Sequence, residues 1–384
     1  MLQIEQNSGD ENFIKWFSEL TGWDCAIAGD KGASIANLYN LGFLVPQGFV
    51  ITTQAYKYFL EQNNMGKIIM KMLGELKIGD KHSCSATSKK IRALFNKSEI
   101  PKHLSEEILE AYDYLSFDQN KIEQEKSEAV ELLGQASELG LVSVRSSIVK
   151  PETREKVNDI KFETFLHVRG KKYVLDKVKA CFSSLFAVEG LSHLIQKGIG
   201  FNEYNMAVIV QKMIPSDMAG VIFSQMHSHT GDRMSIELKK SSENSREHYI
   251  IDRDLSNFNI LESSLTENNS ASEKKQSLSP YELKMLAQHA QNIEHRLGEP
   301  QEITFALSER KFYFLQSKPV EMLPQKPFLE SDDKQKEMTN DASENIGYLY
   351  ELAASAPKNN KEKKESADIE DIILKELGDS PKGP

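Results

Sequence analysis

Residues 28–53 read AGDKGASIANLYNLGFLVPQGFVITT, and this stretch decides the fold. It joins a glycine-flanked lysine loop to a helix expected at residues 33–40, and a turn at Pro46 and Gly48 then leads into a strand at 49–52. The loop places Lys31 and several backbone N–H groups at a helix N-terminus, which is a favourable place for phosphate. Because Gly-x-Lys-Gly also occurs in ordinary surface turns, a plain turn before a helix is the competing interpretation.

Three later segments add polar groups to apolar strands. Residues 141–147, LVSVRSS, predict a strand that ends in an arginine and two hydroxyls. Residues 204–224 predict two apolar strands, at 207–212 and 220–224, around a Pro-Ser-Asp turn. Residues 300–319 predict a strand pair, at 303–307 and 312–316, with an acid near its start and a lysine near its end.

In this order the four segments resemble the nucleotide-binding N-terminal region of the phosphoenolpyruvate synthase and pyruvate phosphate dikinase family. The resemblance covers roughly residues 10–325, or most of the chain. It implies an α+β, ATP-grasp-like fold with two lobes and a nucleotide cleft between them. It also implies ATP and Mg²⁺ as cofactors, and a phosphate that passes to a histidine on a separate partner protein, because the chain contains no Gly-Gly-x-x-Ser-His-like segment.

The same resemblance assigns roles to individual residues. Lys31 and Arg145 would contact the phosphates and take part in catalysis, and Glu302 would hold the magnesium. The backbone of residues 208–213 would meet the adenine. The complete expected nucleotide-binding set is Lys31, Arg145, Gln211, Met213, Glu302, Gln316 and Lys318.

The sequence departs from the family pattern at four points. The family's Asp-Ile-Glu-Trp is Glu302-Ile-Thr-Phe here, so Thr304 replaces the second of two acids that would point the same way from a strand. The family's Leu-Gln-x-Arg-Pro ends in Lys318-Pro, which keeps the charge and loses the two-pronged guanidinium. A Gly-Leu-Gly-Glu stretch after Glu237 and a glycine loop after residue 147 are also missing, so the backbone loses close approach to phosphate.

Composition and charge limit the partners and the compartment that we expect for this protein. The 384 residues carry a net charge of −10, so we expect no nucleic-acid or membrane partner. Three widely spaced cysteines without a Cys-x-x-Cys pair indicate a reducing compartment, and no targeting signal is apparent at the N-terminus. Together these features predict a cytoplasmic protein.

Three regions are expected along the chain. Residues 1–203 would form the N-terminal lobe, residues 204–325 the C-terminal lobe, and residues 326–384 a polar, mostly disordered tail. Apolar spacing predicts an opening helix at 11–23 and a helix-rich stretch at 53–139, whereas the polar residues 252–279 predict a surface loop. Within the tail, residues 367–377 form a candidate helix, which is either transient or a docking element for a partner.

Three functions remain open from the sequence. The first is an ATP-binding phosphotransferase module that works with a separate phosphohistidine protein. The second is a degenerate, non-catalytic nucleotide-binding or scaffold protein, which the missing glycines and Thr304 favour. The third is a self-contained kinase for a small molecule, for which the sequence shows no acceptor pocket.

Overall fold

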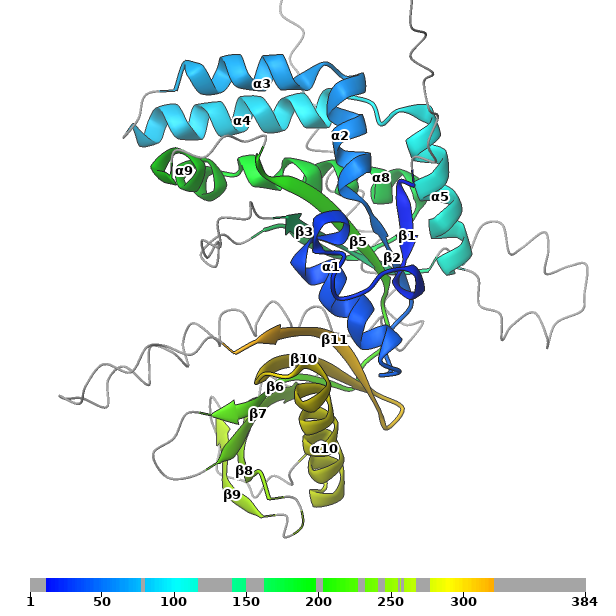
Figure 1. Ribbon diagram of the computed structural model, residues 1–384, viewed down its shortest axis with the longest axis vertical. Helices are drawn as coiled ribbons and strands as arrows, with labels where there is room; N and C mark the ends of the chain where they lie inside the picture. Colours follow the sequence, from blue (N-terminus) through cyan, green and yellow to red (C-terminus); the bar gives the residue numbers. More distant parts are fainter. Residues whose placement is uncertain are drawn as a thin grey trace, which may run out of the picture.

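The computed structural model of the chain contains two β-sheets, each covered by helices (Figure 1). The predicted mixture of helices and sheets in two lobes is therefore confirmed. The structure describes residues 12–76, 80–116, 140–149, 162–197, 203–226, 232–240, 246–254, 256, 259–266 and 277–320. The expected tail at 326–384 and its candidate helix at 367–377 lie outside these residues.

Sheet A has five strands in the order β1-β2-β5-β3-β4, and every neighbouring pair is antiparallel. Its middle strand, β5, is buried almost throughout, because Met206, Val208 and Val210 face one core and Ala207 and Ile209 face another. The strand bounds are β1 Ile14–Trp16, β2 Gly48–Ile51, β3 Val142–Val149, β4 Thr164–Val168 and β5 Asn205–Lys212.

Six α-helices in the described residues cover one face of sheet A and form the upper lobe in Figure 1. A core of aromatic and aliphatic side chains joins them to the sheet, with the Phe59 ring in contact with the rings of both Phe95 and Phe182. Residues 171–195 form a stretch that is long and apolar enough to cross a membrane by length and composition alone. However, 56% of its most apolar part is buried in this lobe. The helices are α2 Thr53–Gln62, α3 Met65–Gly74, α4 Lys81–Lys97, α5 Lys102–Ser116, α8 Lys171–Ser183 and α9 Val188–Lys197.

Sheet B has six antiparallel strands in the order β11-β10-β6-β7-β8-β9, and helix α10 (Pro280–Leu297) packs on one face (Figure 1). The sequence around α10 shows why it forms there: Ser279 and Glu282 make a reciprocal capping box, and Gly298 ends the helix at φ +81°. The strands are β6 Met218–Met226, β7 Arg233–Lys240, β8 Arg246–Asp252, β9 Ile260–Thr266, β10 Gln301–Ser308 and β11 Lys311–Pro319.

Helix α1 (Cys25–Asn40) lies at the junction of the two lobes (Figure 1). Its apolar residues, such as Ile35 and Leu38, share one hydrophobic core with Val50 and Ile209 of sheet A and with the α10 face of sheet B. The expected loop at Gly29–Gly32 is replaced by a kink inside this helix, where Gly29 alone is non-helical at φ +70°. The helix starts eight residues earlier than predicted because Cys25–Ala28 form a short helical segment before the kink.

Two other local expectations are wrong. The opening helix at 11–23 is instead strand β1, which pairs with β2, followed by a 3₁₀ turn at Phe17–Glu19, and Phe13 and Phe17 on either side of the strand are both buried. The surface loop at 252–279 contains edge strand β9, which pairs with β8. Its polar side chains are tolerated because an edge strand exposes one side to water.

The lobes are joined between β5 and β6. The expected N-terminal lobe ended at residue 203. Residues 1–203 contribute four of the strands of sheet A, but the fifth strand, β5, follows residue 203. We therefore propose residues 213–217, between β5 and β6, as the boundary of the lobes.

The kink in α1 generates the first prediction. A Cβ added to Gly29 would lie 2.3 Å from Ser147 Oγ and 2.6 Å from the Ser147 carbonyl oxygen, at a positive φ. We expect Gly29→Ala to lower the free energy of unfolding by about 2 kcal/mol or more, measured by urea denaturation. Gly66→Ala in α3 is the control, because a Cβ there meets no atom within 4 Å and alanine favours a helix. Equal effects of the two substitutions would contradict the prediction.

Candidate functional site

The kink at Gly29 brings the start of the second helical segment of α1 against both sheets. The Gly32 N–H donates a hydrogen bond to Ser147 Oγ of β3 at 3.1 Å, and the Ser34 hydroxyl donates to the Ser317 carbonyl oxygen of β11. Lys31 lies between these two anchored residues and is half-buried. Its ammonium group is therefore held at the meeting point of α1, β3 and β11.

Arg145 reaches the same place from β3. Its side chain is 1% exposed, and the guanidinium donates hydrogen bonds from Nη2 to Gln316 Oε1 at 2.6 Å and from Nη1 to the Leu315 carbonyl oxygen at 3.3 Å. Both of these acceptors are neutral, so these two bonds hold the cation in place without cancelling its charge. The contact also fastens sheet A to strand β11 of sheet B.

Neighbouring positive charges act on Lys31. Burial, as the largest cause, and the nearby charges of Arg145 and Lys318 together lower the pKa of Lys31 to about 8. These cations come from three elements that are distant in sequence. The site consequently has a positive potential that favours an anion with several charges.

Two of the predicted residues form an ion pair at the edge of this site. Lys318 Nζ of β11 lies 3.0 Å from Glu302 Oε2 of β10, and the two residues are directly paired across the strands. Gln316 is paired with Thr304 in the next row along the same face. The structure thus brings together Lys31, Arg145, Glu302, Gln316 and Lys318, while their roles stay predictions.

A second carboxylate, Glu237 of β7, was missed from the sequence. Thr304 and Glu237 both pair with Val221 of β6, so Glu237 lies in the same cross-strand row as the threonine that replaces the family's second acid. Burial raises the pKa of Glu237, and the charge of Glu302 raises it further, against the opposite effect of Arg246. The available signal was an acid between two apolar residues of a strand, Ile236 and Leu238.

The two residues predicted for adenine make other contacts. The buried Gln211 side chain donates from Nε2 to the Pro46 carbonyl oxygen at 3.1 Å, which braces the start of β2. Met213 follows β5; its N–H donates to the Leu141 carbonyl oxygen at 2.9 Å, and its sulfur accepts the His167 N–H at 3.0 Å. Their expected roles toward adenine stay untested, and Gln211 has a structural contact of its own.

An apolar cluster lies beside Met213, on the side of sheet B opposite α10. Leu166 of β4 and Ile214 pack against the buried residues Ala219, Val221, Ala306 and Leu315. Ala306 lies two and four residues from Thr304 and Glu302 on the same strand, so the apolar cluster and the carboxylates share one face of the sheet. The site therefore combines a charged end with an apolar end.

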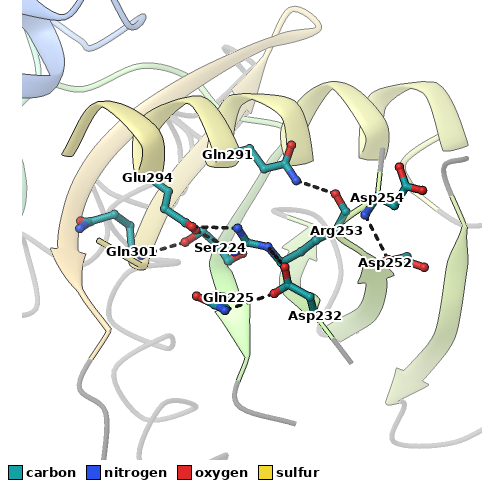
Figure 2. A network of polar contacts seen from close by, with 9 residues as sticks. All are labelled: Ser224, Gln225, Asp232, Asp252, Arg253, Asp254, Gln291, Glu294 and Gln301. Carbon is teal, nitrogen blue, oxygen red and sulfur yellow. Dashed lines mark hydrogen bonds and ion pairs between the residues drawn. The ribbon is translucent and has the colours of Figure 1, made fainter. Parts of the chain in front are cut away.

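A polar network on sheet B supports the strand that carries Glu302 (Figure 2). The Arg253 guanidinium forms a two-pronged pair with Glu294 of α10, at 2.8 and 2.9 Å, and an ion pair with Asp232 at 3.1 Å. Burial by itself raises the pKa of Glu294, but hydrogen bonds from Arg253 and Ser224 outweigh it, so the pKa is lowered.

The network continues to the start of β10. Ser224 Oγ accepts the Gln301 N–H at 2.8 Å, and Gln301 Oε1 accepts the Ser317 hydroxyl at 2.6 Å (Figure 2 shows the Ser224 contact). Gln301 and Ser317 directly precede Glu302 and Lys318. The Arg253 network thus fixes the backbone from which the ion-paired residues project.

Comparison with known proteins gives one family. The model of the family described as "Pyruvate phosphate dikinase, AMP/ATP-binding domain" matches residues 25–340. A probable phosphoenolpyruvate synthase of Methanocaldococcus jannaschii is 31% identical over 347 residues, which cover 84% of this chain and 28% of that protein. The phosphoenolpyruvate synthase of Aquifex aeolicus is 36% identical over 228 residues, which cover 57% of this chain and 24% of that protein.

This chain spans between about a quarter and about half of the length of the curated relatives it matches. Among solved structures, a D-alanine–D-alanine ligase from Helicobacter pylori aligns with a TM-score of 0.24 at 13% identity, over 61% of this chain and 54% of that one. A likeness this low bears on neither the fold nor the function.

The charge cluster generates a prediction about pH. Because folding lowers the pKa of Lys31 from 10.5 to about 8, the unfolded chain binds more protons between these values, and Lys31 costs stability below pH 8. We expect Lys31→Met to raise the free energy of unfolding at pH 7 by on the order of 1 kcal/mol. This advantage should shrink as the pH rises from 8 toward 10.5. Urea denaturation at several pH values measures it, and a constant difference between the variants would count against the assignment.

The Arg253 network generates a prediction about stability. Removing one partner of an ion pair whose side chains are each only 16% exposed leaves the other partner uncompensated, so we expect Arg253→Ala to cost about 3 kcal/mol in urea denaturation. Arg310→Ala is a matched control, because Arg310 also pairs with a glutamate of α10, Glu282, but its side chain is 81% exposed. The control should cost about 1 kcal/mol or less. Similar losses for both variants would refute the buried role of Arg253.

Proposed function

Because this chain belongs to the pyruvate phosphate dikinase AMP/ATP-binding domain family, we propose that it binds ATP between sheet A and sheet B and uses it as a phosphoryl donor. The observation that carries the proposal is the convergence of Lys31, Arg145 and Lys318 from α1, β3 and β11. Lys31 is held close to the other two cations, and this costs stability in the free protein even though Lys318 is paired with Glu302. A polyphosphate chain would relieve this repulsion on binding.

The polyphosphate would lie at the charged end of the site. Phosphoryl transfer needs fixed cations that neutralise charge spreading over the phosphate oxygens, and the protein has little covalent chemistry to do itself. Arg145 suits this task because its guanidinium is already positioned by Gln316 and by the Leu315 carbonyl. Lys31 suits it because an approaching anion raises the pKa of the ammonium group and keeps it charged.

The base of the nucleotide would lie at the apolar end. The cluster of Leu166, Ile214 and Val221 offers apolar contacts beside the connection between the lobes. The backbone of residues 208–213 would meet the ring edge, as the family resemblance implies. Gln211, which is bonded to Pro46, would act by supporting the strand that leads into this connection.

Magnesium fits the site as a partner of the phosphates. In the described residues no group of three or more histidine, cysteine, aspartate or glutamate side chains is arranged to hold a metal. Glu302 and Glu237 provide two carboxylates on one face of sheet B, and Mg²⁺ is commonly held by one or two carboxylates together with phosphate oxygens. When bound there, the ion would neutralise phosphate charge, and Lys318 would release Glu302 for this purpose.

The phosphoryl acceptor is proposed to be a histidine on a separate protein. The imidazole nitrogen would attack a phosphorus atom of ATP, and the bond to the bridging oxygen would break, so that a phosphoryl or pyrophosphoryl group moves to the partner. The relatives named phosphoenolpyruvate synthase, of which this chain matches less than half, support a module that acts with further protein.

One observation favours a non-catalytic alternative. In the free protein Lys318 already neutralises Glu302, and Thr304 supplies no charge in the position of the family's second acid. A chain with this arrangement would bind nucleotide with little help from a metal and would serve as a sensor or scaffold. Metal dependence therefore separates the two functions.

Isothermal titration with ATP, with and without Mg²⁺, tests the proposal. We expect Lys31→Met to weaken ATP binding about tenfold or more, which corresponds to about 1.4 kcal/mol. Lys57→Met is the control, because Lys57 is exposed on α2. Glu237→Gln should reduce the gain in affinity that Mg²⁺ confers and leave metal-free binding nearly unchanged. Absence of ATP binding would refute the proposal, and binding indifferent to both Mg²⁺ and Glu237→Gln would favour the non-catalytic alternative.

A further inference from the structure

A cavity of about 450 Å³ lies on the helix-covered side of β4, between α4 and α8. The side chains that give it chemical character are Arg92 and Asn96 of α4, Glu163 and Phe165 at β4, and Lys177 and Lys179 of α8. Its volume is in the range of sites for small metabolites. Nothing in the proposed nucleotide chemistry uses it.

The cavity and the nucleotide site lie on opposite faces of the same strand. Successive side chains of a strand alternate between its two faces. Phe165 packs with the helical core, whereas the next residue, Leu166, packs in the apolar cluster of the nucleotide site. Glu163 likewise lies on the helix side, because it pairs with Arg92 of α4.

The charges in the cavity leave a surplus of one cation. Arg92 is paired with Glu163, and Lys179 is paired with Asp176 at 3.4 Å and bonded to the Asn96 carbonyl oxygen at 3.2 Å. Lys177 has no ion pair with a carboxylate among the described residues; its ammonium lies 4.5 Å from the centre of the Phe165 ring. Lys177 and Lys179 therefore offer one anionic group a binding point at the α8 wall.

The opposite wall offers a hydrogen-bond acceptor. Glu163 Oε2 is buried and has no hydrogen-bond partner among the described residues, although Oε1 is engaged by Arg92. A buried carboxylate oxygen without a donor is costly, so a ligand hydroxyl that donates to it would be stabilised. The cavity thus presents cations on one side and a carboxylate oxygen without a hydrogen bond on the other.

We propose that this cavity binds a small phosphate monoester that carries hydroxyl groups, and that its occupancy changes the affinity of the nucleotide site. The phosphate would lie against Lys177 and Lys179, and a hydroxyl would donate to Glu163 Oε2. The Glu163 carbonyl oxygen accepts the Ser146 N–H at 3.0 Å, and Ser146 follows Arg145 in β3. A shift of Glu163 would reach Arg145 through this pairing; this regulatory part rests on the proposed function.

Titration of the full chain with sn-glycerol 3-phosphate, without nucleotide, tests the binding site. We expect saturable binding, about tenfold weaker binding of methyl phosphate, which lacks hydroxyls, and no binding of glycerol. Lys177→Met removes the charge and keeps the alkyl chain beside Phe165, and it should weaken binding about tenfold. Lys172→Met, on an exposed position of the same helix, should bind as the wild type does.

Two results would overturn the site: no saturable binding of glycerol 3-phosphate, or equal losses in Lys177→Met and Lys172→Met. A second titration, with ATP in saturating glycerol 3-phosphate, tests the regulatory part. A change in the ATP dissociation constant that disappears in Lys177→Met supports it, and an unchanged constant refutes it. If ATP fails to bind at all, the proposed function and the regulatory part fall together, while the first titration still decides the phosphate site.

Discussion

The contact between the Arg145 guanidinium and strand β11 is the interaction on which the rest of this molecule depends. A fully buried cation must be solvated by the protein, and here a carbonyl of β11 and the Gln316 amide provide two of its hydrogen bonds. Both acceptors belong to the other sheet. The two lobes therefore meet beside the Lys31, Arg145 and Lys318 charges, and α1 joins the lobes through its shared hydrophobic core.

This arrangement lowers the stability of the free protein and favours the binding of an anion. Lys31 would be easier to accommodate as an apolar residue, because burial and two neighbouring cations all disfavour its charged form. Strained or repulsive groups that persist in a folded protein are most often found at functional sites. The Arg253 network on the far side of sheet B supplies compensating stability, since its charges are paired and its bonds lead to the strand that carries Glu302.

Sequence reasoning succeeded where local chemistry determines structure and failed where tertiary pairing does. Strand β2 was predicted from the Pro-Gly turn, because neighbouring residues suffice to specify it. The helix expected at 11–23 failed because Phe13 and Phe17 are also buried when the segment between them pairs with β2 as a strand. Glu237 was overlooked because its closeness to Glu302 arises from the register of β7, β6 and β10, which no local pattern encodes.

The chain crosses from sheet A to sheet B between β5 and β6, and within the described residues each sheet is built from one continuous stretch of sequence. Each lobe is therefore encoded by one continuous segment of the gene. A break in the gene near residues 213–217 would leave two polypeptides whose recognition surface already exists, since the apolar side of α1 is complementary to sheet B. The architecture is accordingly suited to evolution by fission, fusion and exchange of its halves, with α1 deciding which halves are compatible.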